Sequence, residues 1–356
     1  MDVTYFGPLP PHPGGIAQHG DALIDGFLRR GHRVQRLSWR DLYPPRLYPG
    51  SVASKDRNPR SDALELADWH DPRTWVRAGW RARAGDAIVL PWVTPFHAPA
   101  VLTTLSACAE VARLILVHNA LPHERHRGDT LAIRAALRQA DGAVVHATSV
   151  ADDLSWLLPR LQVAVVPHPP NLPLSATPLP APTPLRVLVF GYVRAYKGVE
   201  SALDALGLLT SQGSDVRLTI AGEFWEPVDE WVKEIAGRGL GERVSLRPGY
   251  VADEDVQELF DAHHVLLAPY RSATQSGTIP LARAAGRAVV ATDVGGLREA
   301  IDDGADGLLV PAGSAERIAV ALQETQARLQ DLAAASASRT SRWEDVADAF
   351  TALAGR

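Results

Sequence analysis

The residues best suited to chemistry lie in two short segments of the second half of the chain, each directly after a candidate strand. The first runs from Phe190 to Gly198 and contains Gly191, Arg194 and Lys197. Two cations three residues apart suit a diphosphate, because arginine forks onto phosphate oxygens and lysine acts as a compact charge. A solvated basic turn is the alternative. We expect Arg194 and Lys197 to neutralise phosphate, with Gly191 leaving room for it.

Small hydroxyl residues fill the second segment, which follows a strand that ends at Pro269. Its candidate binding residues are Gln275, Ser276, Gly277 and Thr278. Small residues at the start of a helix leave backbone amides free to hold an anion. An ordinary capping turn is the alternative. The two segments together predict a phosphate held from two sides.

Two further glycine turns follow strands. Gly14 and Gly15 precede a helix near the N-terminus, where glycine lets a ligand approach the backbone. The spacing is not G-x-G-x-x-G, so no dinucleotide fingerprint is present. The second turn contains Gly295 and Gly296. Glu299 follows it at the opening of a helix, where the helix dipole favours a carboxylate. A tight turn alone, or helix capping alone, would also account for these residues.

Ten of the twelve histidines precede residue 171, and three of them lie close together as His118, His123 and His126. Their spacing does not form a helical ligand face, and no H-E-x-x-H pair is present, so we expect no metal site. His118 ends a strand, where an imidazole can hydrogen-bond a ligand hydroxyl. His146 and His168 also follow strands, and a structural role for them stays open.

These candidates must be positioned by the alternation of short β-branched runs with amphipathic segments, which is typical of parallel sheets covered on both faces. We expect strands at residues 3–6, 34–37, 87–90, 114–117, 143–146, 163–166, 186–190, 217–221, 243–246, 265–268, 288–291 and 308–310. We expect helices at residues 16–30, 199–209, 227–238, 253–262, 279–285, 315–331 and 342–354. The predicted fold class is therefore α/β, with two doubly wound Rossmann-like domains that face a central cleft.

A proline-dense stretch gives this fold its expected domain boundaries. Residues 171–184 have too few backbone donors for a helix or a central strand and are predicted to be a linker. The N-terminal domain is then expected at 1–170 and the C-terminal domain at 185–337. The final segment, 338–356, is predicted to be a helix that packs back on the first domain.

The composition excludes several classes of protein. A chain of 356 residues with 46% hydrophobic and 22% charged residues is typical of a soluble globular protein, and length alone favours two domains. A net charge of −5 argues against a nucleic-acid binder, and one cysteine, Cys108, excludes an internal disulfide. The uncharged run 87–109 is broken by prolines, so we expect a strand, a loop and a helix rather than a membrane span. No secretory signal is visible, which predicts a cytoplasmic protein.

The segments FGYVRAYKG, LTIAGEF, PYRSATQSG and GRAVVATDVGGLREAIDDGADGLLVP match a known pattern in order and spacing. So do PGGI, VLPWVTPFHAP, LVHNALPHE and VVPHP in the first half. Together they resemble the retaining glycosyltransferases of family 4, which have the GT-B two-domain fold. The resemblance extends over nearly the whole chain.

The resemblance implies roles for the two domains and for the candidate residues. The N-terminal domain, 1–170, is expected to be the acceptor-side domain, and the C-terminal domain, 185–337, the nucleotide-sugar-binding domain. Arg194 and Lys197 correspond to the pair that neutralises the donor diphosphate, and His118 to a first-domain histidine near the donor sugar. Gly14 and Gly15 correspond to the glycine turn that approaches the donor. Members of the family approach the base near Glu223 and the turn at residues 249–251, and no cofactor beyond the donor is implied.

The chain departs from the family where two glutamates eight positions apart are usual, the first on the donor sugar and the second on the ribose. Ala273 and Thr274 occupy the region of the first glutamate, and Leu281 and Ala282 that of the second. Gln275 can hydrogen-bond a sugar hydroxyl but cannot act as a carboxylate base.

We therefore expect a metal-independent, retaining hexosyltransferase that moves a sugar from a nucleotide-diphospho sugar to a glycan or lipid-linked acceptor. A non-catalytic sugar-nucleotide-binding partner of another glycosyltransferase is the alternative, and an epimerase or phosphorylase is a third. Residues 38–85 are a candidate acceptor groove, since Trp39, Trp69, Trp75 and Trp80 can stack on sugars or simply pack. The arginines at 29, 30, 33 and 36 leave peripheral contact with the inner face of a membrane open.

Overall fold

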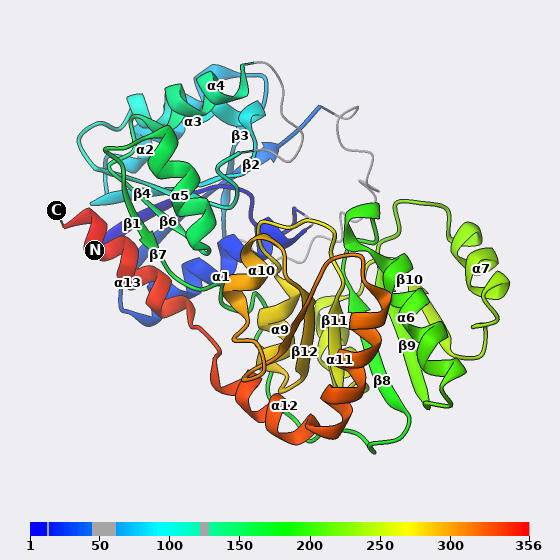
Figure 1. Ribbon diagram of the computed structural model, residues 1–356. Coiled ribbons are helices and arrows are strands. Elements are labelled where there is room, and N and C mark those ends of the chain that lie inside the picture. The colour runs from blue at the N-terminus through cyan, green and yellow to red at the C-terminus, as the bar shows by residue number, and fades with distance from the viewer. Residues whose placement is uncertain (13, 45–61, 122–127, 356) are drawn as a thin grey trace. The chain divides into compact units, whose positions relative to one another are not determined.

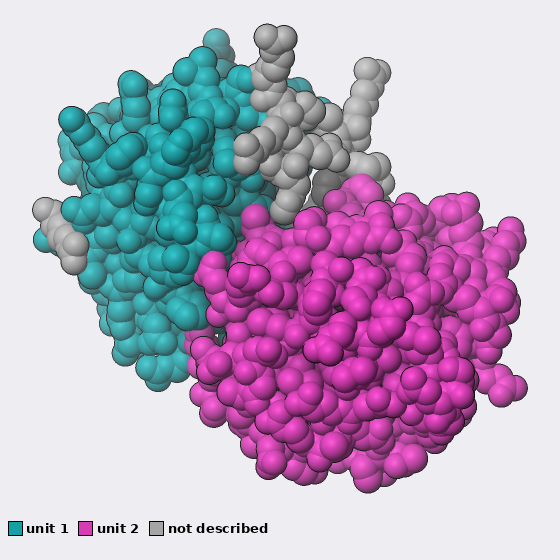
Figure 2. Space-filling model, in the orientation of Figure 1, with its two compact units in different colours: residues 1–171, 342–356 teal, residues 172–341 magenta. Residues whose placement is uncertain are grey.

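The computed structural model describes residues 1–12, 14–44, 62–121 and 128–355 (Figure 1). The chain forms two compact units (Figure 2). Unit 1 contains residues 1–171 and 342–356, and unit 2 contains residues 172–341. Each unit is a parallel sheet with helices on both faces, which confirms the predicted α/β class and the two Rossmann-like domains.

The sheet of unit 1 has seven strands in the order β3-β2-β1-β4-β5-β6-β7. They are β1 (Asp2–Phe6), β2 (Arg33–Asp41), β3 (Leu64–Asp68), β4 (Ala87–Trp92), β5 (Ala112–Val117), β6 (Gly142–Val145) and β7 (Gln162–Val165). The central strand β4 is buried along its whole length. Its residues alternate between the two faces, because successive side chains in a strand point to opposite sides. Ile88 and Leu90 pack into one core and Val89 into the other.

In the described part of unit 1, six helices and one short 3-10 turn cover this sheet. They are α1 (Gly15–Arg29), α2 (Pro72–Ala82), η1 (Pro95–His97), α3 (Ala98–Ser106), α4 (Asp129–Leu137), α5 (Thr148–Leu157) and α13 (Trp343–Ala354). Helices α2 to α5 share one core, and α1 and α13 share the other. The uncharged run 87–109 is thus a strand, a proline-containing turn and a helix, as predicted.

The sheet of unit 2 has six strands in the order β10-β9-β8-β11-β12-β13. They are β8 (Leu185–Phe190), β9 (Val216–Gly222), β10 (Val244–Pro248), β11 (Val265–Ala268), β12 (Ala288–Thr292) and β13 (Leu308–Val310). Strand β8 comes first in the sequence and lies inside the sheet, with β9 and β10 on one side of it and β11, β12 and β13 on the other. The loops that follow β8, β9 and β11 therefore leave neighbouring strands at the same edge of the sheet, where open α/β sheets bind ligands.

Two groups of helices cover the faces of this second sheet. The helices of unit 2 are α6 (Val199–Ser211), α7 (Val228–Gly237), α8 (Val256–Asp261), α9 (Thr278–Ala284), α10 (Gly295–Ala300), α11 (Ala315–Ala327) and α12 (Leu329–Ser338), with η2 (Ala195–Lys197) and η3 (Asp253–Asp255) as 3-10 turns. The first face is covered by α6, α7, α11 and α12, and the second by α8, α9 and α10.

All twelve predicted strands are present, and helices α2, α4, α5 and α10 lie outside the predicted helical ranges. Two further elements differ from the prediction. The edge strand β3 was not predicted, because Leu64 and Glu65 are exposed and the strand has no apolar run. The predicted helix 315–331 is two helices, because Arg328 leaves the helical conformation with φ −117° and ψ 23°. Its side chain donates a 2.7 Å hydrogen bond to the carbonyl of Gly304, which holds the chain at this break.

The proline-rich stretch is fixed to unit 2 by hydrogen bonds to its carbonyl groups. The buried Arg287 donates to the hydroxyl of Thr177 and to the carbonyl of Pro178. The ring of His264 lies 3.1 Å from the carbonyl oxygen of Ala181. The same arginine pairs with Asp261 at 2.9 Å, so its charge is compensated inside the unit.

The last helix, α13, completes the core of unit 1. Trp343 is buried, and its indole N–H donates a 2.7 Å hydrogen bond to the carbonyl of Pro170. Along α13, Val346, Ala347 and Phe350 pack in the core that α1 also lines. A Cβ atom on Gly26 of α1 would lie 2.6 Å from the carbonyl oxygen of Trp343, so glycine permits this close approach. Within the described residues, no helix has both the length and the apolar character needed to cross a membrane.

Candidate functional site

The turn after β8 is pinned on both sides by backbone contacts inside unit 2. The amide of Val193 donates to the carbonyl of Glu223 at 2.8 Å, next to the end of β9. Gly198 has φ 64°, and a Cβ atom there would lie 2.1 Å from the carbonyl oxygen of Pro269, after β11. Only glycine fits this conformation and this contact. The turn therefore fixes the backbone of Lys197 between the loops of two neighbouring strands.

Lys197 ends η2, and its side chain is buried, with 7% of its surface exposed. Its ammonium group donates a 2.5 Å hydrogen bond to the hydroxyl of Tyr270 and lies 4.1 Å from the centroid of that ring. Among the residues that the structure describes, no carboxylate forms an ion pair with Lys197. A buried cation is costly unless it is paired, so this ammonium is suited to an anionic ligand.

Two hydroxyl groups complete this cluster. The Oγ atom of Ser276 and the Oγ1 atom of Thr278 each lie 3.3 Å from the hydroxyl oxygen of Tyr270 and 2.9 Å from one another. A Cβ atom on Gly191 would lie 3.6 Å from the ammonium nitrogen of Lys197 and 3.7 Å from the methyl carbon of Thr278. Gly191, Lys197 and Thr278 therefore border one space, which the missing side chain leaves open. We name Gly191, Lys197, Tyr270, Ser276 and Thr278 the lysine cluster.

The charge of Lys197 changes the acidity of its neighbour. Burial alone would raise the pKa of the Tyr270 phenol. The positive charge of Lys197 and the hydrogen bonds from Lys197, Ser276 and Thr278 outweigh burial, so the pKa of Tyr270 lies below its ordinary value. The backbone of Tyr270 is fixed as well, because Thr292 donates a 2.6 Å hydrogen bond to its carbonyl.

Arg194 points to a different loop from Lys197. Its guanidinium carbon lies 3.2 Å from the centroid of the Trp225 ring, in the loop after β9. Its Nε atom is buried and has no hydrogen-bond partner in the described parts of the chain. Glu223, two residues before Trp225, is half-buried and gives its carbonyl to the turn after β8. The two cations thus border the same turn, with Lys197 directed to the β11 loop and Arg194 to the β9 loop.

The remaining predicted residues of unit 2 lie around the loop after β11. Gln275 is half-buried, and Gly277 immediately precedes α9. Glu299 is exposed on α10. The start of α10 contacts the β11 loop, since a Cβ atom on Gly295 would lie 1.8 Å from the carbonyl oxygen of Ala273. The structure therefore brings the helix of Glu299 beside this loop.

Leu281 and Ala282 are the positions that the resemblance predicts to take the place of a second glutamate. Both are buried in α9 and pack in the core of unit 2. Neither side chain can accept a hydrogen bond from a ligand hydroxyl.

The predicted residues of unit 1 lie at the carboxyl edge of its own sheet. Gly14 precedes α1 with φ 102°, a conformation that favours glycine, and a Cβ atom on Gly15 would meet no atom within 4 Å. His118 follows β5, and its ring centroid lies 4.6 Å from that of His19 on α1. Two of the histidines considered with it, His123 and His126, lie outside the described residues. So do residues 45–61 of the predicted acceptor groove.

His118 belongs to a cluster of four histidines, His19, His118, His146 and His168, which we name the histidine cluster. The ring nitrogens Nε2 of His19 and His146 are 2.8 Å apart, and Nδ1 of His146 lies 2.8 Å from the carbonyl oxygen of Val166. The carbonyl can only accept, so His146 donates from Nδ1, and its Nε2 accepts a hydrogen bond from Nε2–H of His19. This arrangement requires His146 to be neutral, because its Nε2 must carry no proton.

The pKa values of the histidine cluster agree with neutral rings. Burial is the main cause, and it lowers the pKa of His118 to about 3 and that of His168 to about 4. Burial and the neighbouring histidines also lower the pKa of His19 and His146 well below the ordinary value. In the described ranges, no three histidine, cysteine or acidic side chains are arranged to hold a metal ion.

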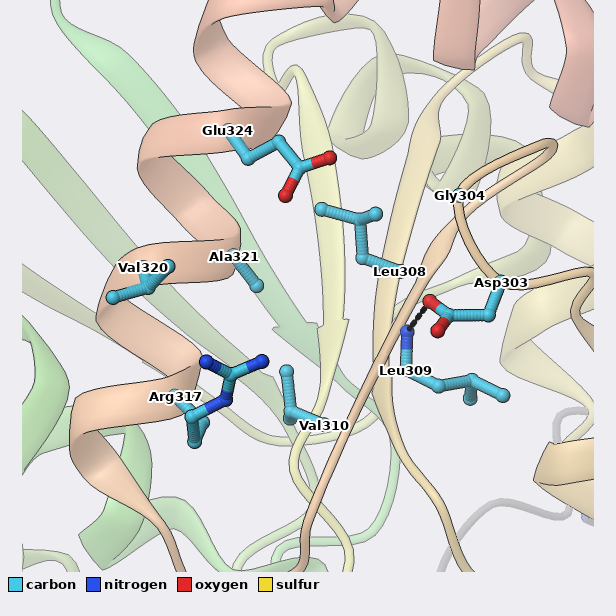
Figure 3. Close-up of a pocket in the computed structure, with 9 residues that line it drawn as sticks. All are labelled: Asp303, Gly304, Leu308, Leu309, Val310, Arg317, Val320, Ala321 and Glu324. Atoms are coloured by element: carbon cyan, nitrogen blue, oxygen red, sulfur yellow. Dashed lines mark hydrogen bonds between the residues drawn. The ribbon is translucent and has the colours of Figure 1, made fainter.

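A pocket of about 160 Å³ lies elsewhere in unit 2, between β13 and α11 (Figure 3). Asp303 closes one side of it by accepting a 2.8 Å hydrogen bond from the amide of Leu309. Strand β13 is at the edge of the sheet, and β11 and β12 separate it from β8. The pocket is therefore separate from the lysine cluster.

Sequence reasoning missed Tyr270, Trp225 and His19. Tyr270 follows a buried strand and has the apolar ring of a core residue, and its contact with Lys197 joins positions 73 residues apart. His19 lies on the apolar face of an amphipathic helix. For Tyr270, its place directly after a strand end beside the polar segment was an available signal.

Comparison with known proteins gives matches in sequence and in fold. The family model described as "Glycosyl transferases group 1" matches residues 184–327. The alpha-D-kanosaminyltransferase of Streptomyces kanamyceticus is 33% identical over 35% of this chain and 32% of its own length. The D-inositol 3-phosphate glycosyltransferase of Paenarthrobacter aurescens is 30% identical over 58% of this chain and 53% of its own length. The matches thus span about half or less of these relatives.

Solved structures extend the likeness to the whole fold. Sucrose-phosphate synthase from Thermosynechococcus elongatus has a TM-score of 0.77 at 18% identity, over 99% of this chain and 98% of its own. HepE from Anabaena, solved in complex with UDP, has a TM-score of 0.73 at 17% identity, over 99% of both chains. Residues 184–327 therefore match the model of group 1 glycosyltransferases, and the two units have the GT-B fold.

Proposed function

We propose that the protein is a glycosyltransferase that uses a nucleotide-diphospho sugar and binds its diphosphate at the lysine cluster of unit 2. The observation that carries this proposal is the buried ammonium of Lys197, which has no carboxylate partner among the described residues. Gly191 leaves open space beside it, and Ser276 and Thr278 add hydroxyl donors. Cationic and hydroxyl groups of this kind stabilise the charge that develops on a leaving diphosphate.

The finer features of the reaction belong to the same proposal. We infer transfer of a hexose with retention of the anomeric configuration, without a metal ion or another cofactor, in the cytoplasm. Arg194, Glu223, Gln275, Gly277 and Glu299 are proposed to contact the donor around the lysine cluster. The glycine pair and His118 of unit 1 are proposed to take part in recognising the donor sugar.

The acceptor is proposed to be a hydroxyl of a glycan or of a lipid-linked sugar. One relative is named as an inositol phosphate glycosyltransferase and another as a kanosaminyltransferase, so inositol phosphates belong in the panel of acceptors and amino sugars in the panel of donors to be tested. Peripheral membrane contact through the arginines of unit 1 is part of the proposal only for a lipid-linked acceptor. Co-sedimentation with anionic vesicles tests it, and equal recovery with neutral vesicles would exclude it.

The Lys197→Met variant tests the proposed diphosphate site. We expect its Kd for the donor to rise about 10- to 100-fold, because the charged hydrogen bonds of the ammonium are lost. Thermal shift with uridine, guanosine and adenosine diphospho-sugars identifies the donor for wild type, and calorimetry gives the two Kd values. Lys233→Met removes an exposed lysine of α7 from the same unit and serves as the control. Equal donor affinity in wild type and Lys197→Met would exclude this site.

A second candidate function is a sugar-nucleotide-binding partner of another glycosyltransferase, without activity of its own. The buried, apolar Leu281 and Ala282 favour it, because the carboxylate usual in that region is missing. Tight donor binding with neither hydrolysis nor transfer over the whole acceptor panel would support the partner. Transfer to any acceptor by wild type, lost in Lys197→Met, would support the enzyme.

A further inference from the structure

We propose that Tyr270 is a positioning residue: it holds the Lys197 ammonium in place and directs the hydroxyl protons of Ser276 and Thr278 toward a bound diphosphate. This inference rests on the proposed function, since it assigns the diphosphate to the lysine cluster. Tyr270 itself is placed behind the binding groups, in contact with them.

The direction of each hydrogen bond follows from the chemistry of the groups. An ammonium has three N–H donors and no acceptor, so Lys197 donates to the hydroxyl oxygen of Tyr270 at 2.5 Å. The phenol O–H of Tyr270 is then free to donate its own hydrogen bond to Ser276 or Thr278, whose oxygens are both 3.3 Å away. The hydroxyl that accepts this hydrogen bond can in turn donate one to the other hydroxyl, at 2.9 Å.

The hydroxyl at the end of this series of hydrogen bonds can donate a hydrogen bond to a ligand. A phosphate oxygen is a charged acceptor and forms a stronger hydrogen bond than a neutral hydroxyl does. When a diphosphate is present, the last proton therefore points to it, and the two remaining N–H groups of Lys197 can do the same. The open space beside Gly191 borders both Lys197 and Thr278, so one anion can meet the ammonium and the hydroxyl together.

Tyr270 is rigid enough for this role. It is buried, with 2% of its surface exposed, and its ring packs in the core of the α8–α10 face. Thr292 holds its carbonyl from β12, while its ring approaches that of Tyr196 at 6.1 Å. Because its carbonyl and its ring are both held, Tyr270 can keep the flexible Lys197 side chain in one position. Less conformational entropy of the lysine is then lost when a ligand binds.

The charges around Tyr270 also make the proposal testable by pH. Lys197 is the charge in contact with the phenol, whereas the adjacent Arg271 is exposed and pairs with Glu200 of α6 at 3.2 Å. The lowered pKa of Tyr270 means that its phenolate forms at lower pH than in free tyrosine. A phenolate repels a diphosphate, so affinity falls as the phenol loses its proton. By linkage, bound diphosphate must raise the pKa of Tyr270.

The test is the Tyr270→Phe variant, measured with the nucleoside diphosphate that gives wild type its largest thermal shift. We expect Kd near neutral pH to rise about tenfold, because the ammonium loses its fixed position. Wild type is expected to show an alkaline fall in affinity together with a tyrosinate absorbance change that the ligand shifts to higher pH. Both signals should disappear in Tyr270→Phe, and a purely structural role would move neither.

Tyr196→Phe is the matched control, because it removes a hydroxyl from a tyrosine whose ring lies 5.8 Å from the same ammonium. It should keep the affinity and the alkaline step of wild type. Thr278→Val keeps the Lys197–Tyr270 hydrogen bond and removes one of the hydroxyl groups. Its affinity should therefore fall a few-fold, while the alkaline fall in affinity stays as in wild type. This variant replaces Tyr270→Phe in the test if Tyr270→Phe does not fold. Wild-type affinity and an unchanged alkaline step in Tyr270→Phe would overturn the inference. If Lys197→Met also binds normally, the proposed function is wrong too.

Discussion

Lowering the pH from about 7.5 to about 5 is expected to destabilise unit 1 by about 2–4 kcal/mol. The cause is the histidine cluster, in which the His19–His146 hydrogen bond requires a neutral His146 and burial disfavours the charged form of all four rings. In the unfolded chain these histidines take up protons near pH 6.5, whereas burial keeps the folded rings neutral to far lower pH. Protons therefore bind mainly to the unfolded state, and stability falls as the pH drops below about 6.5.

The size of this effect follows from His118 and His168. Each ring that stays neutral in the fold costs about 1.4 kcal/mol per pH unit below its unfolded pKa. His118 and His168, with pKa values of about 3 and 4, stay neutral down to pH 5. Together they would contribute about 4 kcal/mol, and their partial exposure to solvent reduces this figure.

Urea unfolding between pH 5 and 7.5 measures the effect, and His168→Phe identifies its source. Tryptophan fluorescence reports mainly on unit 1, which contains seven of the nine tryptophans. The variant keeps a ring against His146 and Trp343 but cannot take up a proton, so its stability should depend less steeply on pH. His70→Phe changes an exposed histidine of the same unit and should keep the wild-type slope. Equal slopes in wild type and His168→Phe would contradict this explanation.

Gly222→Ala is expected to destabilise unit 2 by about 2–5 kcal/mol. Gly222 ends β9 with φ 133°, which favours glycine, and an added Cβ atom would lie 2.0 Å from the carbonyl oxygen of Gly191. The backbone must move to relieve this contact. Because Gly191 belongs to the lysine cluster, we also expect weaker diphosphate binding by whatever fraction of the variant folds.

Gly207→Ala provides the matched control in the same unit. Gly207 lies inside α6, and an added Cβ atom would meet no atom within 4 Å. Alanine is the better helix former, so this variant should gain about 0.5–1 kcal/mol. The midpoints of urea unfolding should therefore move in opposite directions for the two variants. A Gly222→Ala protein as stable as wild type would show that β9 and the turn after β8 are not held as closely as described.

The fold was largely predictable because its signals are local. Buried β-branched runs separated by amphipathic segments predict strands and helices wherever both faces of the sheet are covered. The exception, β3, is an edge strand with exposed residues at its start, so its hydrophobic pattern is weak. The break at Arg328 was not predicted, since both flanking segments favour helix and the contact of Arg328 with Gly304 joins positions 24 residues apart.

The residue types of the candidate site could be predicted from the sequence, but the directions of their side chains could not. Lys197, Ser276 and Thr278 were identified because charged and hydroxyl residues after strand ends gather at one edge of a sheet. Their spacing could not show that Lys197 points to the β11 loop while Arg194 stacks on Trp225, because those directions depend on packing between distant segments. The binding roles of these residues stay predictions until the variants are measured.

The return of α13 to unit 1 has a consequence for the order of folding during synthesis. All of unit 2 leaves the ribosome before Trp343 does, although unit 1 contains the start of the chain. Until then, the apolar side chains of α1 that α13 covers stay exposed, among them Leu23, Ile24 and Phe27. Domains generally fold as units once their chain is available. The second unit of the sequence is thus the first that can be finished, and the last dozen residues close the first.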